Sequence, residues 1–231
     1  MGYILLEGGA EFGGLMSAPD TRAMELAGGL DAPIRIIPTA AAPDDNHMRA
    51  GMNGVTWFRS LGARDVSSLH IVDKTSANNK TIAESLQRAK MIYLLGGFPG
   101  YLGQTLKNSL AWKSALEAYQ NGAVIAGSSA GAMVLCRLFY DPDAEQVVEG
   151  LGLVPNALIL PHHNTFGAGW AARLSSQVPG LVLLGIDERT GLLDDGSGEN
   201  WSVLGRGAAT LYRGEEKMVY RAGEMFSCSV Q

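Results

Sequence analysis

The chain has 231 residues, of which 46% are hydrophobic and 18% charged, with a formal net charge of −5. This length and apolar content predict one α/β domain spanning residues 1–231, and the acidic balance without basic runs argues against nucleic acid or an anionic membrane surface as a partner. The start lacks the basic region of a signal peptide, and no stretch approaches the ~18 apolar residues of a membrane helix, so we expect a cytoplasmic protein.

Short apolar runs alternate along the chain with stretches of helical periodicity. The apolar runs predict strands at Tyr3–Leu6, Ile34–Ile37, Leu69–Val72, Met91–Leu95, Ala123–Ala126, Ala157–Leu160 and Leu181–Ile186. The stretches between them predict helices at residues 18–30, 47–61, 77–89, 101–121, 130–138 and 167–177. Continuously apolar strands that alternate with helices are typical of an α/β fold with a mostly parallel sheet sandwiched by helices.

The pattern changes after Ile186. Short strands are predicted at Thr190–Leu193, Trp201–Leu204, Ala208–Tyr212 and Lys217–Tyr220, separated by turn sequences such as DDGSGEN. We therefore expect a short antiparallel C-terminal extension packed on the edge of the main sheet.

The stretch AVIAGSSAGAMVL, residues 123–135, contains a Gly-x-Ser-x-Gly pattern where a buried strand gives way to a helix. In an open parallel sheet, chemistry gathers at the C-terminal ends of the strands, and a serine at a sharp strand-to-helix turn is typical of a nucleophile. The alternative is a tight turn in which Ser129 caps the following helix. The position favours Ser129 as a nucleophile.

A serine nucleophile needs a base, and the chain has only four histidines, His47, His70, His162 and His163. Because none follows residue 163, a triad must run in the order Ser129, then His162 or His163, then an acid. The acids that follow predicted strands are Asp187, Glu188 and Asp194, and the residues alone leave this choice open. The other alternative is that no triad exists.

Two further features bear on bound ligands. The loop GGAEFGG, residues 8–14, has neither a Walker lysine nor the Rossmann spacing, so we expect a tight loop bordering the pocket. Cys136 and Cys228 form no disulfide or metal-ligand pattern, and no ligands are spaced for zinc. The expectation is a site without metal or cofactor.

Several blocks in order resemble the peptidase S51 family of serine hydrolases, which includes aspartyl dipeptidase and cyanophycinase. The blocks are IIPTA, LLGG, AGSSAGAMVL, GLGLVPNALILPHH, GIDERTGLL and VLGRGAATLY, between residues 36 and 212. The resemblance implies a fold like that of class I glutamine amidotransferases and a Ser-His-Glu triad. On this chain, the triad falls on Ser129, His162 and Glu188.

The resemblance also implies backbone N–H groups that stabilise an oxyanion, here Ala130 and either Gly97 or Phe98. The family's chemistry needs no metal or organic cofactor. It implies a small peptide as substrate, cleaved by a dipeptidase or omega-peptidase, with Asp- and isoaspartyl-containing peptides among the candidates. Whether the protein forms a homodimer is left open. We expect substrate contacts from Phe98, Pro99, His163, Asn164 and Arg173.

The chain departs from cyanophycinase in having Pro161 before the histidine and Arg173 as a lone arginine after it, which argues against cyanophycin as substrate. Two other functions remain as alternatives: a non-catalytic binding protein of the same fold, and an esterase or amidase acting on non-peptide substrates.

Overall fold

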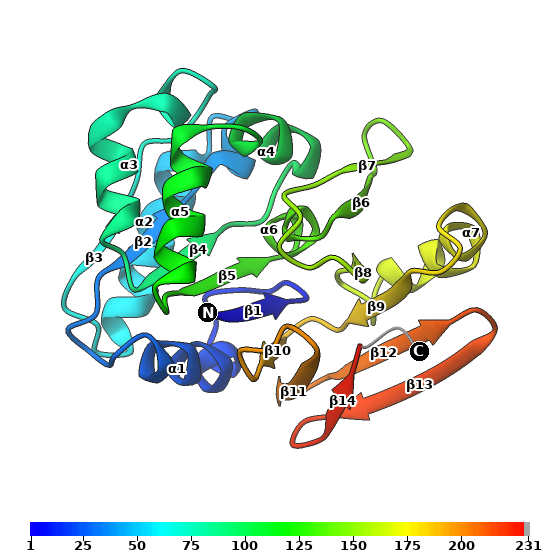
Figure 1. The fold of residues 1–231 in the computed structure, drawn as a ribbon. Coiled ribbons are helices and arrows are strands. Elements are labelled where there is room, and N and C mark those ends of the chain that lie inside the picture. The colour runs from blue at the N-terminus through cyan, green and yellow to red at the C-terminus, as the bar shows by residue number, and fades with distance from the viewer. Residues whose placement is uncertain (229–231) are drawn as a thin grey trace.

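The computed structural model describes residues 1–228 and is built around an eight-stranded sheet (Figure 1). Its strands follow the order β14-β11-β10-β1-β5-β4-β2-β3. The five strands from β1 to β3 are parallel, whereas β10, β11 and β14 join them antiparallel on the β1 side. The bounds are Tyr3–Glu7 for β1, Ile34–Ile37 for β2, Val66–Ser68 for β3, Met91–Leu94 for β4, Val124–Ser128 for β5, Thr190–Asp194 for β10, Asn200–Gly205 for β11 and Met225–Ser227 for β14.

A second, four-stranded sheet carries the rest of the C-terminal half. It pairs β8 (Ala157–Leu160) parallel to β9 (Val182–Ile186), and β9 antiparallel to β12 (Ala208–Arg213), with β13 (Glu216–Arg221) at the edge. The expected C-terminal extension on the main sheet is therefore correct for β10 and β11 and wrong for β12 and β13. The chain leaves β11 through Gly205, at φ 100°, and β12 pairs with β9 instead.

Helices cover both faces of the main sheet, which confirms the predicted fold class. Buried side chains of α1 (Ser17–Leu26) and α2 (His47–Ser60) pack on one face, against alternate residues of β1, β4 and β5. The other face is covered by α3 (Lys80–Gln87), α4 (Pro99–Leu106), α5 (Leu110–Gln120) and α6 (Ala130–Leu135). A separate apolar cluster joins α7 (Ala171–Gln177) to the second sheet.

The remaining elements are short. They are a hairpin of β6 (Leu138–Asp141) and β7 (Gln146–Glu149), which the sequence did not predict, and four 3-10 turns: η1 (Gly14–Met16), η2 (Thr39–Ala41), η3 (Ser76–Asn78) and η4 (Gly167–Trp170).

Two predicted elements are wrong in detail. The strand expected at Leu69–Val72 lies instead at β3, just before it, where the main-chain pairing with β2 ends at Ser68. The single helix expected over residues 101–121 is two helices, α4 and α5. Asn108 takes a left-handed φ of 59° between them, and the Ser109 hydroxyl then caps α5 by accepting the Trp112 N–H.

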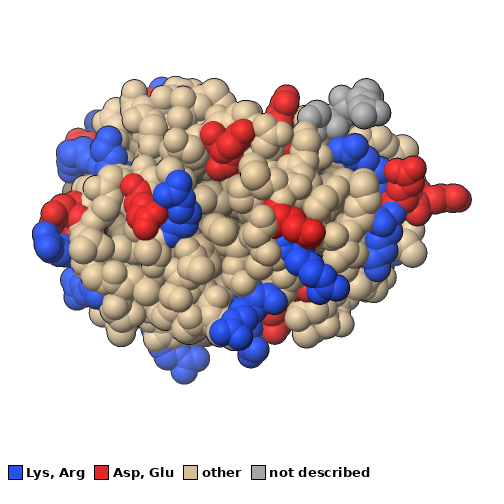
Figure 2. Space-filling model, turned by 90° about the horizontal axis from the view of Figure 1, so that it is seen from below, with Lys and Arg blue, Asp and Glu red and all other residues tan. Residues whose placement is uncertain are grey.

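Within residues 1–228, no helix is long and apolar enough to span a membrane. On the face seen in Figure 2, lysine and arginine side chains lie among aspartate and glutamate side chains.

Candidate active site

Ser129 sits at a sharp turn between β5 and α6, with φ 49° and ψ −113°. The flanking glycines permit this turn. A Cβ on Gly127 would lie 2.5 Å from the carbonyl carbon of Gly131, and a Cβ on Gly131 would lie 2.2 Å from the carbonyl oxygen of Leu94. Only glycine fits both positions, so the Gly-x-Ser-x-Gly pattern is a packing requirement of the strand-to-helix turn.

Three polar side chains meet at the C-terminal ends of β5, β8 and β9. Ser129 Oγ lies 3.0 Å from His162 Nε2, and His162 Nδ1 lies 2.9 Å from Glu188 Oε1. The imidazole is about one fifth exposed and the carboxylate somewhat more, so both stay accessible from one side. The structure thus brings together the hydroxyl, the imidazole and the carboxylate that the family resemblance assigned.

The end of β1 connects the three segments that carry these side chains. The Glu7 carbonyl accepts the Ser129 N–H at 2.9 Å, the Gly8 carbonyl accepts the His162 N–H at 2.7 Å, and the Gly9 carbonyl accepts the Arg189 N–H at 3.1 Å. These three carbonyls are consecutive in the chain. Residues 7–9 therefore join the main sheet to the second sheet at the site.

The loop after β1 also packs directly on the site. Gly9 has φ +121°, and a Cβ on it would lie 2.2 Å from His162 Cε1, so the imidazole fills the space that glycine leaves. Glu11 Oε2 accepts a hydrogen bond of 2.9 Å from the hydroxyl of Ser128, the residue before Ser129. The sequence predicts only that this loop borders the pocket.

Backbone strain is concentrated around the site. Of the non-glycine residues with positive φ, Ala10, Phe12, Ser129, His162 and Arg189 all belong to the segments just described. Such conformations cost on the order of 1 kcal/mol or more each and persist where the surroundings enforce them.

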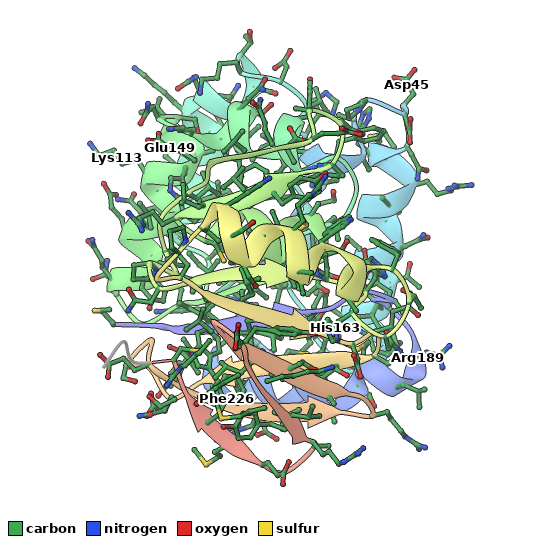
Figure 3. The ribbon with its side chains drawn as sticks, turned by 90° about the vertical axis from the view of Figure 1, so that its right-hand side faces the viewer. Asp45, Lys113, Glu149, His163, Arg189 and Phe226 are labelled. Atoms are coloured by element: carbon green, nitrogen blue, oxygen red, sulfur yellow. The ribbon has the colours of Figure 1, made fainter. Side chains whose placement is uncertain are left out.

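His163, predicted to contact substrate, is turned away into a buried cluster of its own. Its side chain is 7% exposed, its Nε2 lies 2.8 Å from the Tyr212 hydroxyl, and its Nδ1 lies 3.4 Å from Asp187 Oδ1. Burial lowers the pKa of His163, partly offset by Asp187. Figure 3 labels His163 beside the ends of β8 and β9. The imidazole next to Ser129 is His162.

Asn164 and Phe166 contact Glu188 and His162 directly. The side chain of Asn164, predicted to contact substrate, accepts the Glu188 N–H on Oδ1 at 2.9 Å. The Phe166 ring, 54% exposed, stacks on the His162 imidazole with the ring centres 5.0 Å apart. Phe166 therefore forms one wall of the site.

The other predicted substrate contacts are Arg173, Pro99 and Phe98. Arg173 lies on α7, and its guanidinium is placed over the Tyr140 ring, 4.5 Å from the ring centre. Pro99 is buried in the first turn of α4, where its missing N–H costs nothing. Phe98, next to it, is half-buried.

The turn at residues 96–98 shapes the region that faces Ser129. Gly97 has φ +136°, and a Cβ there would lie 2.2 Å from the Ala40 carbonyl oxygen. The same oxygen accepts the Phe98 N–H at 2.9 Å, so Phe98 is removed from the predicted oxyanion donors. In the described part of the chain the Gly97 N–H has no backbone acceptor. Ala130 is the first residue of α6, and the N–H groups in the first turn of a helix have no acceptor within that helix.

Two buried carboxyl groups lie beneath the site. Glu7 accepts a hydrogen bond from the Tyr93 hydroxyl, and Asp20 accepts one of 2.7 Å from the indole N–H of Trp57. Burial raises the pKa of Glu7 well above its usual value and raises the pKa of Asp20 to about 7. Both pKa values are raised because no cation among the described residues forms an ion pair with either carboxyl group to offset the loss of water.

Among residues 1–228, no group of three or more histidine, cysteine, aspartate or glutamate side chains is placed to hold a metal ion.

Comparison with known proteins identifies the family. Residues 4–199 match the family model of Peptidase family S51. The chain belongs to peptidase family S51. It is 30% identical over 224 residues to a cyanophycinase of Synechococcus elongatus, covering 91% of this chain and 67% of the relative. It is 28% identical over 200 residues to a cyanophycinase of Geminocystis herdmanii (strain PCC 6308), covering 82% and 72%.

Solved structures agree with this assignment. A peptidase from an acI-B1 Actinobacterium superposes with a TM-score of 0.88 at 29% identity, over 98% of this chain and 97% of the other. A putative peptidase E protein from Listeria monocytogenes EGD-e shares the fold, with a TM-score of 0.62 at 21% identity, over 96% of this chain and all of the other. This member of family S51 is a serine peptidase.

Proposed function

We propose that the protein hydrolyses small peptides, as a dipeptidase or omega-peptidase, through Ser129, His162 and Glu188. The observation that carries the proposal is the unbroken chain of contacts from hydroxyl to imidazole to carboxylate, at 3.0 and 2.9 Å. Those distances allow a proton to pass from the hydroxyl to the imidazole without any rearrangement of the backbone.

The chemistry follows from the positions of these atoms. His162 Nε2 removes the Ser129 proton as Oγ attacks the scissile carbonyl, and Glu188 orients the ring and stabilises its charged form. The imidazolium then protonates the leaving amine, which breaks the C–N bond and leaves an acyl-enzyme. Water, deprotonated by His162, hydrolyses the ester and restores the serine.

Two backbone N–H groups are available for the oxyanion. Ala130 follows the nucleophile at the start of α6, and Gly97 lies across the site in the turn after β4. Removing one such donor from a serine hydrolase typically costs about 10²–10³ in kcat. The shape of the Gly97 turn, which only glycine can adopt against Ala40, supports its role as the second donor.

The substrate proposed is a short peptide, with Asp- and isoaspartyl-containing dipeptides among the candidates, rather than cyanophycin itself. The cyanophycinases among its relatives give the reaction class. Two features argue against the same polymer here: Pro161 stands before the histidine, and the guanidinium of Arg173 is held over Tyr140. A cytoplasmic location is part of this proposal, and the two buried free cysteines fit a reducing compartment.

Labelling with a fluorophosphonate, followed by mass spectrometry, tests the catalytic assignment. We expect an adduct on Ser129 that is lost in His162→Ala, because the hydroxyl then lacks its base. His163→Ala is the matched control and should still label, since His163 contacts Tyr212 and not the nucleophile. An unlabelled wild-type protein, shown to be folded, would refute the proposal.

A dipeptide library with free and blocked termini, including N-terminal Asp and isoaspartyl members, tests the substrate class. We expect turnover of dipeptides. Turnover confined to carboxylic esters would refute the peptidase assignment and favour an esterase.

A further inference from the structure

A cavity of about 490 Å³ lies beside α2 and reaches Gly96, where a Cβ would lie 3.3 Å from Ser129 Cβ. Its walls are the loop after β1, the end of β4 and one side of α2, represented by Glu11, Phe12, Leu95, Gly96, Asn53 and Trp57. None of these residues takes part in the proton transfer proposed above. The cavity is large enough for an amino-acid side chain or terminus.

The geometry at Gly96 fixes how far this cavity lies from the reacting serine. A Cβ on Gly96 would lie 3.1 Å from Glu11 Oε1 and 3.3 Å from Ser129 Cβ, so these two atoms are at most 6.4 Å apart. Since Gly96 has no side chain, nothing from that residue separates the carboxylate from the nucleophile. A substrate whose scissile carbonyl meets Ser129 therefore brings its neighbouring groups within reach of Glu11.

The charge of the cavity comes from Glu11. Its one hydrogen-bond donor in the described part of the chain is the neutral Ser128 hydroxyl, on Oε2, and no lysine, arginine or histidine forms an ion pair with it there. Oε1 remains free to accept a further bond. The aromatic rings of Phe12 and Trp57, which also line the cavity, suit a cation as well.

We propose that this cavity is a binding subsite for a protonated amine or guanidinium group of the substrate, held by Glu11. The proposal rests on the peptidase function above. The cation can come from two parts of the substrate that share this chemistry. One is its free amino terminus, whose nitrogen lies about 2.5 Å from the carbonyl carbon of the same residue. The other is a lysine or arginine side chain of the substrate that extends toward α2. Glu11 is thereby a specificity-determining residue.

Protection of Ser129 from fluorophosphonate labelling measures binding without requiring turnover. n-Butylammonium and n-butylguanidinium should slow labelling of the wild type, and n-butanol should not. In Glu11→Gln the protection constant should weaken about 10- to 100-fold, the range of a lost charge-assisted hydrogen bond. Ser128→Ala is the matched control, because it removes the hydrogen bond to Glu11 but keeps the carboxylate, and protection should persist.

Substitutions on exposed positions of α2 guard against a Glu11 variant that fails to fold. Thr56 lines the cavity and is exposed, so Thr56→Lys places a competing ammonium there and should also abolish protection. Met52→Lys adds the same charge to α2 but lies outside this cavity and should leave protection unchanged.

Matched substrates then separate the two sources of the cation. A peptide with a free amino terminus, compared with its N-acetylated form, tests the α-ammonium. A peptide that contains lysine, compared with one that contains norleucine at the same position, tests the side chain. One of these pairs should differ about 10- to 100-fold in kcat/KM in the wild type and converge in Glu11→Gln. If Ser129 labels normally but neither cation protects it, or if Glu11→Gln and Thr56→Lys both leave protection unchanged, the subsite is refuted while the peptidase function stands. If the folded wild type does not label at all, it is the peptidase function that fails.

Discussion

Replacing Asp20 by asparagine should raise the free energy of unfolding, relative to the wild type, more at pH 8 than at pH 5. The Asp20 side chain is fully buried, and burial raises its pKa from 3.8 to about 7. Asparagine has nearly the same shape and keeps an oxygen that can accept the Trp57 indole N–H. The substitution therefore removes an ionisable group with little change in packing.

The sign follows from proton binding. Between pH 3.8 and about 7 the unfolded chain has released the Asp20 proton while the folded chain still holds it, so the free energy of unfolding falls as pH rises. The full difference in pKa corresponds to about 4 kcal/mol, at about 1.36 kcal/mol for each pH unit, and roughly 2–3 kcal/mol of it falls between pH 5 and pH 7. The asparagine side chain cannot ionise, so the variant lacks this loss. Burial also raises the pKa of Glu7, so Glu7 contributes a fall of the same sign in both proteins.

Urea unfolding followed by tryptophan fluorescence at pH 5, 6, 7 and 8 measures the effect. The free energy of the variant minus that of the wild type should increase over this range by roughly 2–3 kcal/mol. Asp65→Asn is the control: Asp65 is an exposed partner of Arg35 whose pKa is lowered by that contact, so its contribution is lost only below about pH 4. A difference that stays constant from pH 5 to pH 8 in Asp20→Asn would refute the reasoning.

Two further substitutions test how the site is held. Gly9→Ala should reduce kcat/KM by on the order of 100-fold, since its Cβ would lie 2.2 Å from the His162 ring. Gly14→Ala is the control and should be neutral, because a Cβ there would have nothing within 4 Å. Equal activity of the two variants in steady-state kinetics would contradict the contact between Gly9 and His162. Asn164→Ala should lower kcat about 10-fold with little change in KM, because the Glu188 N–H loses its acceptor, and Asn164→Asp, which keeps an acceptor, should recover most of it.

Local patterns in the sequence predicted which side chains the structure brings together at the strand ends. Ser129 stands at a turn between two glycines of the same short stretch, and the four histidines limited the base to two adjacent residues. The predicted parallel sheet indicated that the C-terminal ends of its strands would meet at one edge. The choice of His162 over His163 and of Glu188 over Asp187 came from the family resemblance, because each pair is adjacent and splits between two environments.

Other features depend on contacts between distant parts of the chain. The hydrogen bond from Ser128 to Glu11 spans 117 residues, and the close approach of Gly9 to His162 spans more, so no spacing in the sequence reveals either. The split of the C-terminal strands between two sheets was hidden for the same reason, since apolar runs show that a strand is buried but not which neighbour it pairs with.

The hydrogen bonds from Ser129, His162 and Arg189 to the carbonyls of residues 7–9 have a consequence for how activity is lost. Each of these three segments follows a different strand, but all three are hydrogen-bonded to the same short piece of backbone. A local opening of that piece would release the segments that carry Ser129, His162 and Glu188 together. Inactivation by heat or denaturant should then proceed as one cooperative event at the junction of the two sheets, ahead of the melting of either sheet.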